Sequence, residues 1–365
     1  MNQIQHRQKK VILFGAGAMI PLGGPTVSQL TKKILIHDSC KYVYQNIQRY
    51  YKDDCDFETL LSAVEFLLEW SFSNDFGEYI SSQHTSILKC VFEKASAYRF
   101  KSKDELWKIY ETIVNEIIEV IKDYDFYPMV TGCQKGEALV HLKDFIINNS
   151  NRSDCKIYTL NYDRLIPCIV GEEVDVYEGI ENQRYSYDIN KFVNHPLTHF
   201  NLHGSIYLHY DYTNGLMLKD NPLELEKPYL LSGGNPNEYK IFLPIIAGYH
   251  KSQRIMSEPF NFGVGAFMYD CNTCDELLVV GYSFRDPHIN SILRAFLKIS
   301  SIKITIIDYN SESVLPRSLS NRINRIFTSN YHFVLKSKGV YTNEHNNVTI
   351  NMNGFNKFIE ECINY

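Results

Sequence analysis

The chain has 365 residues, which is enough for one large domain or two modest ones with a sizeable core. Its composition is ordinary for a globular protein, with 44% hydrophobic and 22% charged residues, and its formal net charge is −5. Proteins that bind nucleic acid mainly through their own surface are usually basic, so we do not expect nucleic acid as the main ligand.

The first predicted elements are a strand, a glycine-rich turn and a helix within residues 9–36. Residues 10–14, Lys-Val-Ile-Leu-Phe, form a short apolar run without alternation after the lysine, which is typical of a strand buried on both faces of a parallel sheet. The Gly-Ala-Gly-Ala turn at 15–18 lets the backbone approach a pyrophosphate. The third glycine of the dinucleotide fingerprint would fall at Ile20, so a tight turn without a ligand is the alternative interpretation.

Residues 40–150 are different in kind, because glycine and proline are scarce there and apolar residues recur at helical spacing. A capping box formed by Ser102 and Glu105 precedes the second apolar stretch. We predict about four helices, forming a subdomain inserted between pieces of an α/β core. The recurring positions are Phe57, Leu60, Leu61, Val64, Leu67 and Leu68, then Leu106, Tyr110, Ile113, Val114, Ile117 and Ile121.

The α/β pattern returns with predicted strands at 156–160, 277–280 and 302–307, and a helix at about 287–297. We therefore predict an α/β protein with a Rossmann-like, mostly parallel sheet of six or seven strands and helices on both faces. Its core would comprise residues 1–39 and 151–330, with the helical subdomain at 40–150. Residues 331–365 would form a C-terminal extension that ends in a short helix near 355–363.

Each predicted strand ends in a small or polar cluster, and ligands bind at the carboxyl ends of the strands in open parallel sheets. Asn161 and Asp163 follow one strand, and such a pair could hold a ribose or a water molecule, although an Asx turn is the alternative. His203, beside Gly204, could accept a proton near neutral pH. It is one of twelve histidines, and we expect His199, four residues upstream, to lie outside the site.

The cysteines indicate free thiols rather than a metal site. Cys271 and Cys274 form a lone CxxC pair, and a structural zinc normally requires four ligands, so we expect no metal. The nine cysteines are irregularly spaced and the chain opens without a signal-like segment, which favours the cytoplasm. No apolar stretch approaches the ~20 residues of a membrane span.

Four motifs in this order resemble the SIR2-like (sirtuin-like) proteins. They are the glycine-rich segment from 15 to 31, Thr-Leu-Asn-Tyr-Asp at 159–163, Leu-His-Gly-Ser at 202–205 and Val-Gly-Tyr-Ser-Phe-Arg-Asp-Pro-His-Ile at 280–289. The last resembles the bacterial SIR2-like branch that is associated with antiphage defence. The resemblance covers roughly residues 10–310, and Met19 departs from it where the family often has a small polar residue.

The resemblance implies an NAD site. His203 would be the general base, Asn161 would position the nicotinamide ribose or the attacking water, and Asp163 would line the nicotinamide pocket. The remaining NAD contacts implied by the resemblance are Gly15, Ala16, Gly17, Ala18, Pro25, Thr26, Gly281, Ser283, Phe284 and Asp308.

The paired CxxC zinc module of deacylating sirtuins is missing, and the helical block occupies the chain instead. This favours water as the acceptor, so the expected activity is that of an NAD+ glycohydrolase that yields nicotinamide and ADP-ribose without a metal. An NAD-dependent protein deacylase and a non-catalytic NAD- or ADP-ribose-binding sensor or scaffold are the alternatives. The resemblance also implies NAD depletion in abortive infection, a homo-oligomer, and a partner ATPase in some systems.

Overall fold

The computed structural model describes residues 7–51, 55–72, 103–125, 134–171, 173–181, 184–185, 188–211, 215–218, 230–232, 239–241, 245–248, 251–256, 260–297, 301–327, 332–343, 345 and 347–363.

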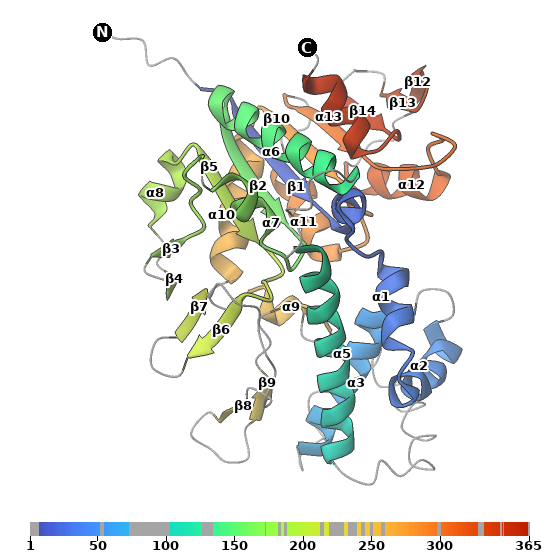
Figure 1. Ribbon diagram of the computed structural model, residues 1–365. Helices are drawn as coiled ribbons and strands as arrows, with labels where there is room; N and C mark the ends of the chain where they lie inside the picture. Colours follow the sequence, from blue (N-terminus) through green and yellow to red (C-terminus); the bar gives the residue numbers. More distant parts are fainter. Residues whose placement is uncertain are drawn as a thin grey trace.

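The centre of the protein is an eight-stranded sheet in the order β12-β13-β14-β11-β10-β1-β2-β5 (Figure 1). Six of its strands pair in parallel. Counted along the chain, these six have the spatial order 3-2-1-4-5-6 of doubly wound Rossmann folds, which confirms the predicted fold class. The parallel strands are β1 (Lys9–Phe14), β2 (Asp154–Thr159), β5 (Leu197–Asn201), β10 (Glu276–Val280), β11 (Lys303–Ile307) and β14 (Val348–Asn351).

The sheet has eight strands rather than the six or seven predicted, because the C-terminal segment joins it. β14 pairs in parallel with β11, and β13 (Val340–Thr342) and β12 (Val334–Ser337) continue the sheet in antiparallel fashion. Val348 and Ile350 of β14 are fully buried, so this strand is part of the core. The polar, Asn-rich composition of 331–365 conceals this, because only alternate residues of β14 carry apolar side chains.

Helices cover both faces of the sheet, as predicted (Figure 1). On one face, α6 (Gln134–Arg152) packs against β2 and against α13 (Phe355–Ile363), whose Phe355 ring lies 5.7 Å from that of Phe14. On the other face, α10 (Phe260–Thr273) packs against β1 and against α11 (Pro287–Phe296), which in turn contacts α12 (Arg317–Ile326).

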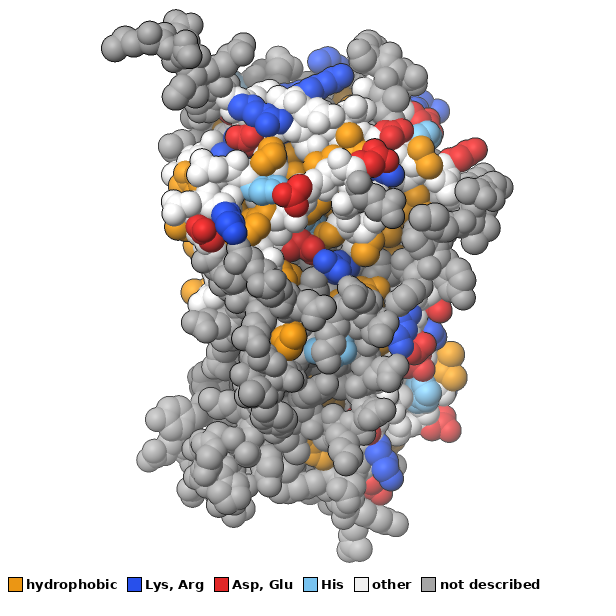
Figure 2. Space-filling view, turned by 60° about the vertical axis from the view of Figure 1, so that its left-hand side comes forward, with side chains coloured by type: hydrophobic (Ala, Val, Ile, Leu, Met, Phe, Trp, Pro, Cys, Tyr) orange, Lys and Arg blue, Asp and Glu red, His pale blue; other side chains and the backbone are white. Residues whose placement is uncertain are grey.

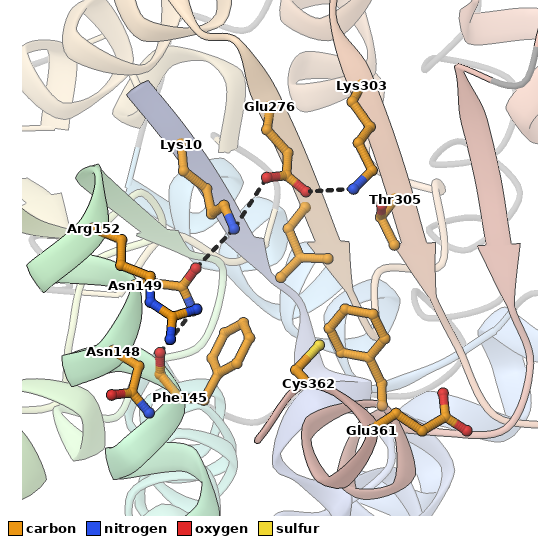
Figure 3. A pocket seen from close by; sticks show the side chains of 12 residues that line it. Lys10, Phe145, Asn148, Asn149, Arg152, Glu276, Lys303, Thr305, Glu361 and Cys362 are labelled. Carbon is orange, nitrogen blue, oxygen red and sulfur yellow. Dashed lines mark hydrogen bonds and ion pairs between the residues drawn. The ribbon is translucent and has the colours of Figure 1, made fainter. Parts of the chain in front are cut away.

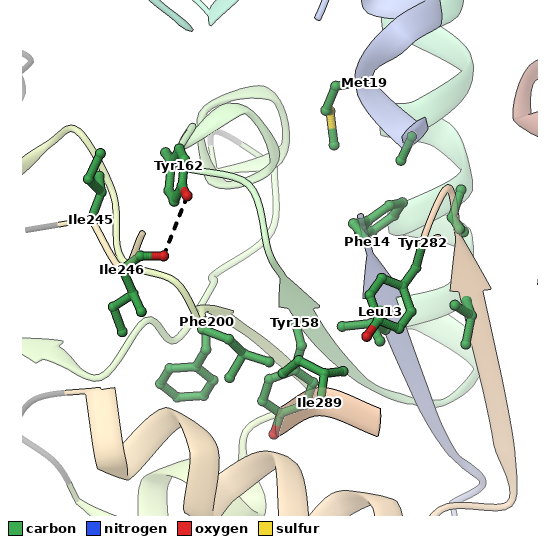
Figure 4. Packing of buried hydrophobic residues seen from close by; sticks show 14 of the residues in the cluster. Leu13, Phe14, Met19, Tyr158, Tyr162, Phe200, Ile245, Ile246, Tyr282 and Ile289 are labelled. Carbon is green, nitrogen blue, oxygen red and sulfur yellow. Dashed lines mark hydrogen bonds between the residues drawn. The ribbon is translucent and has the colours of Figure 1, made fainter. Parts of the chain in front are cut away.

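Large apolar side chains on neighbouring strands fill the space between sheet and helices. The ring of Tyr158 on β2 lies 5.9 Å from that of Phe200 on β5 and 4.8 Å from that of Phe267 on α10. Figure 4 shows Leu13, Tyr158 and Phe200 following one another across the sheet on this face. The strands therefore read as continuous apolar runs because both of their faces are buried.

A helical subdomain projects from the carboxyl edge of the sheet (Figure 1). It consists of α1 (Val27–Ile34), α2 (Asp38–Tyr51), α3 (Phe57–Phe72) and α5 (Lys103–Asp125), which pack against one another. The apolar positions predicted on α3 and α5 are buried. The Ser102 cap predicted for α5 lies outside the described residues.

One helix of the predicted insertion belongs elsewhere. α6, at the end of 40–150, lies on the sheet and not in the helical subdomain, because Phe145 and Ile146 are buried against the sheet side. Conversely, α1 precedes residue 40 but packs against α3 and α5. Helical periodicity identified these helices but carried no information about which neighbour each apolar face would meet.

The remaining elements are short. They are η1 (Ala16–Leu22), α7 (Leu165–Val170), α8 (Ile189–Asn194) and α9 (Lys251–Arg254), a small antiparallel sheet of β3 (Ile180–Glu181), β4 (Arg184–Tyr185), β7 (Gly215–Leu218) and β6 (Leu208–Asp211), and the pair β8 (Leu230–Ser232) and β9 (Tyr239–Ile241).

Two surface properties bear on ligands. Within the described ranges, no helix combines the length and apolarity needed to cross a bilayer. On the face shown in Figure 2, the described acidic and basic side chains are interspersed, so no broad basic patch stands out there.

Candidate active site

The predicted site residues follow strands that end at the same level. In register, Phe14 of β1 pairs with Thr159 of β2 and with Val280 of β10. Thr159 in turn pairs with Asn201 of β5, and Val280 pairs with Ile307 of β11. The loops that follow these strands therefore emerge from one edge of the sheet. Within two residues of the strand ends lie Gly15, Asn161, His203, Gly281 and Asp308.

The two glycine loops touch through their backbones. Gly15 N donates to Val280 O at 2.8 Å, and Gly17 N donates to Gly281 O at 3.0 Å. Gly281 has φ +61°, and a Cβ there would lie 2.1 Å from the Ala18 nitrogen, so only glycine fits. The loops follow β1 and β10, the adjacent strands at which the strand order reverses, which is where doubly wound sheets bind their ligands.

The first loop uses several of its own amides. Besides the two bonds above, Ala18 N donates to Gly15 O at 3.0 Å. Three N–H groups that could cradle a pyrophosphate are thus engaged within the protein. The phosphate contact of this loop stays a prediction. In this conformation the phosphate would have to bind donors other than these three amides.

A cavity of about 100 Å³ lies beside this loop. Pockets for whole cofactor-sized ligands are typically ~300–1,000 Å³, so this one has room for only part of a dinucleotide. Three helices of the subdomain contribute to its wall. It is lined by Ala16, Met19, Pro25, Thr26, Val27, Leu30, Phe57, Glu58, Ile121, Tyr124, Leu160, Asn161 and Tyr162.

The structure brings several predicted residues to this cavity. Thr26 caps α1: its Oγ1 accepts from Gln29 N at 3.1 Å and its N–H donates to Gln29 Oε1 at 2.8 Å. Asn161, only 7% exposed, donates from Nδ2 to Gly15 O at 3.3 Å. Asn201 Nδ2 donates to the carbonyl of Asn161 at 3.0 Å and so stiffens the loop.

The carboxylate of Asp163 is hydrogen-bonded within the protein. It is 2% exposed, and its carboxylate accepts from Tyr124 OH at 2.7 Å and from Leu165 N at 3.1 Å. Burial raises the pKa of Asp163, although both hydrogen bonds oppose that effect. Its side chain ties the loop after β2 to α5 and is not among the cavity lining, so its contact with nicotinamide stays a prediction.

His203 lies at the start of a turn made possible by Gly204, which has φ +78°. It is 4% exposed, and its backbone oxygen accepts from Ile246 N at 2.6 Å. Figure 4 shows Ile246 beside Tyr162, whose hydroxyl donates to the Ile246 carbonyl at 3.4 Å. These bonds hold the histidine loop against the loop after β2.

A carboxylate and an ammonium surround the imidazole. His203 Nε2 lies 3.3 Å from Asp286 Oδ2, and Lys251 Nζ lies 2.9 Å from the same oxygen. Lys251 Nζ also lies 3.4 Å from Glu58 Oε2, at the start of α3. The cluster therefore links His203, through Asp286 and then Lys251, to Glu58, which lines the cavity.

Electrostatics keeps His203 neutral. Burial lowers its pKa, Lys251 lowers it further, and Asp286 only partly compensates. For Asp286, burial would raise the pKa, but the contacts with His203 and Lys251 outweigh it and hold the pKa well below its usual range. For Lys251, burial is outweighed by Glu58 and Asp286, which raise its pKa. A neutral imidazole at neutral pH is the form in which histidine acts as a base.

Comparison with protein-family models finds no match, and neither does comparison with curated proteins. Solved structures do match. A Sir2 homologue in complex with 2′-O-acetyl ADP ribose is 13% identical, with 84% of this chain and 82% of that chain covered and a TM-score of 0.40. A Sir2 homologue–NAD complex is 12% identical over 88% and 91%, with a TM-score of 0.39. Sir2Tm bound to a propionylated peptide is 15% identical over 84% and 83%, with a TM-score of 0.37. Similarity at this level does not establish a family.

The other predicted contacts follow β10 and β11 at the same edge. Ser283 is exposed, whereas Phe284 is 2% exposed and has φ +55°, a conformation that a non-glycine residue rarely adopts. Asp308 is half-buried, burial raises its pKa, and its Oδ1 accepts from Tyr309 N at 2.8 Å. Their role toward NAD stays a prediction.

Sequence reasoning missed Asp286, Lys251 and Glu58 as members of the site. Asp286 precedes Pro287 and caps α11, a pattern that could have been recognised as a helix start. Nothing in the sequence around Asp286 indicates that its second carboxylate oxygen points toward His203. Lys251 and Glu58 are separated by 193 residues, so their contact could not be foreseen from spacing.

Two other predictions concern residues away from this cluster. His199 is 1% exposed within β5, so it is a core residue and unsuitable as a neutral mutational control. Cys271 and Cys274 are both buried, and among the described residues no three His, Cys, Asp or Glu side chains are grouped as metal ligands. The absence of zinc stays a prediction.

A larger hollow of about 480 Å³ lies at the opposite end of the sheet, between α6 and α13 (Figure 3). Lys10 Nζ and Lys303 Nζ there lie 3.0 and 3.5 Å from the Glu276 carboxylate. Figure 3 shows Glu276 between the two lysines, so much of the positive charge is compensated. This hollow lies at the amino ends of the strands and holds none of the predicted site residues. We therefore place the candidate site at the carboxyl edge.

Proposed function

We propose that this protein is an NAD+ glycohydrolase that cleaves NAD+ to nicotinamide and ADP-ribose. The observation that supports the proposal is that four motif-bearing loops follow neighbouring strands at one edge of the sheet. Two glycine loops meet at the switch point of a 3-2-1-4-5-6 sheet, where dinucleotides bind, and a buried amide and a neutral histidine follow the neighbouring strands. The four motifs that resemble SIR2-like proteins lie on these loops.

In the proposed reaction, the bond between C1′ of the ribose and the nicotinamide nitrogen breaks, and its electron pair leaves with nicotinamide. The sugar passes through an oxocarbenium-like transition state, as in glycoside hydrolysis. A water oxygen bonds to C1′ and its proton passes to His203. The side chain of Asn161, held at Gly15 O, would fix the water or the ribose as charge develops.

The decisive experiment is incubation of the purified protein with NAD+, with nicotinamide and ADP-ribose followed by chromatography. His203→Ala and Asn161→Ala should each lower the rate by ~10²–10⁴-fold, the usual effect of removing one positioned catalytic group. The matched control is His332→Ala, an exposed histidine far along the chain from the site loops. Unchanged nicotinamide release in His203→Ala would refute the mechanism.

The same experiment separates the alternatives. A protein deacylase would release nicotinamide only when an acyl-lysine peptide is added. A sensor or scaffold would bind NAD+ or ADP-ribose without turnover, including under conditions in which a partner is supplied. The missing CxxC zinc module favours hydrolysis over deacylation.

The cellular role follows from the resemblance alone. Hydrolysis of NAD+ would arrest an infected bacterial cell, as in antiphage defence, and the enzyme would act in the cytoplasm as a homo-oligomer, with or without a partner ATPase. Cellular NAD+ measured during phage infection, in cells with the wild type and with His203→Ala, tests this role. Equal NAD+ levels in the two would contradict it.

A further inference from the structure

Asp286 is held in one orientation by the helix that it starts. Its Oδ1 accepts from His288 N at 2.9 Å and from Ile289 N at 3.3 Å, the first amides of α11. With one oxygen fixed there, Oδ2 is directed at His203. A carboxylate can accept hydrogen bonds but cannot donate them, so Asp286 favours the tautomer with the proton on Nε2. Nδ1 is then the nitrogen that can accept a proton.

The imidazole of His203 and the ammonium of Lys251 compete for that single oxygen. Lys251 Nζ is 0.4 Å nearer to Asp286 Oδ2 than His203 Nε2 is, at 2.9 against 3.3 Å. Among the described residues, His203 Nε2 has no well-aligned hydrogen bond, so its 3.3 Å contact with Asp286 Oδ2 is the looser of the two. The ammonium thus weakens the support that the carboxylate gives to the imidazole, and it repels the imidazolium that proton transfer would create.

Lys251 is shared between the core and the helical subdomain. Asp286 belongs to the core, whereas Glu58 lies in the first turn of α3 and lines the cavity beside Asn161. Movement of α3 toward Lys251 would draw the ammonium from Asp286, and movement away would return it. Among the described residues, Tyr162 is a further titratable neighbour, buried near Glu58, Asp286 and Asp56.

Building on the proposed function, we infer that Asp286 is the positioning residue of His203 and that Lys251 restrains the histidine by occupying the same carboxylate. The helical subdomain then regulates the site through Glu58, which competes with Asp286 for Lys251.

Removal of each charge should move the His203 pKa in a predictable direction. Lys251→Met and Lys251→Gln remove a repelling cation, so the pKa should rise by on the order of one unit. Asp286→Asn keeps a helix cap but removes the supporting anion, so the pKa should fall. Glu58→Gln removes the second carboxylate that holds Lys251, so the ammonium would pair with Asp286 alone and the His203 pKa should also fall. If Lys251 and Glu58 only maintained the fold, their substitutions would not be expected to shift the His203 pKa in opposite directions.

The measurement is an NMR titration of the His203 imidazole, assigned with His203→Gln, which requires no turnover of NAD+. The control is Lys143→Met on α6, which breaks an ion pair with Glu173 and should leave the titration unchanged. The inference is overturned if the Lys251 variants lower the pKa or match the control, or if Glu58→Gln raises it. If the wild type cleaves NAD+, the acid limb of its pH profile of kcat/KM should shift in each variant in the same direction as the His203 pKa. If it cleaves no NAD+ under any condition, the proposed function fails, whereas the titration still decides the roles of Asp286 and Lys251.

Discussion

The contact between the two glycine loops makes a sharp prediction about Gly281→Ala. At φ +61° a left-handed alanine costs ~1–2 kcal/mol. The added methyl group would lie 2.1 Å from Ala18 N and 2.3 Å from Gly17 C, and both are backbone atoms that cannot swing away. Overpacking of this kind costs ~1–3 kcal/mol. Displacement of the loops would also break the 3.0 Å bond from Gly17 N to Gly281 O, at about 1 kcal/mol.

Together these effects predict that Gly281→Ala lowers the free energy of unfolding by about 3–6 kcal/mol. Urea unfolding followed by circular dichroism measures this, with NAD+ affinity by calorimetry as a second readout. The matched control is Gly265→Ala on the exposed side of α10, where an added methyl group meets nothing within 4 Å. That change should be neutral or stabilising by up to ~1 kcal/mol. A Gly281→Ala protein as stable as the control would refute the close approach of the loops.

Three further predictions concern buried polar groups. Burial lowers the pKa of His199 from 6.5 to about 3, so the unfolded chain binds a proton there that the folded chain does not, and stability should fall by about 2 kcal/mol between pH 7 and pH 5. In urea unfolding, His199→Gln should show a shallower loss over this range, and an equal loss would contradict the assignment. Arg254→Met removes the 2.9 Å contact with the fully buried Glu65 carboxylate and should cost ~3–5 kcal/mol of unfolding free energy, whereas a near-neutral result would show that this ion pair is not formed. Tyr124→Phe removes a 2.7 Å hydrogen bond to Asp163 and should cost ~1–3 kcal/mol in the same assay, and no loss would contradict the link between α5 and the loop after β2.

Much of the core could be predicted because its signals are local. A strand buried on both faces is a continuous apolar run, and residues 10–14 and 277–280 lie within β1 and β10. The predicted helix near 355–363 coincides with α13 for the same reason, since its apolar residues recur at helical spacing. The carboxyl ends of parallel strands lie at one edge of the sheet. Knowing where the strands end was therefore enough to predict that Gly15, Asn161, His203 and Gly281 share that edge.

The tertiary structure alone decided which elements meet. β14 joins the sheet because its edge pairs with β11, and α6 leaves the helical block because its apolar face fits the sheet. The surroundings of His203 were decided in the same way. Asp286 is 83 residues from His203 along the chain, and Glu58 is 193 residues from Lys251. The sequence by itself determined the strands, the glycine turns and the candidate base. The charges that tune that base come from three distant segments, whose contacts depend on packing and leave no periodic trace in the sequence.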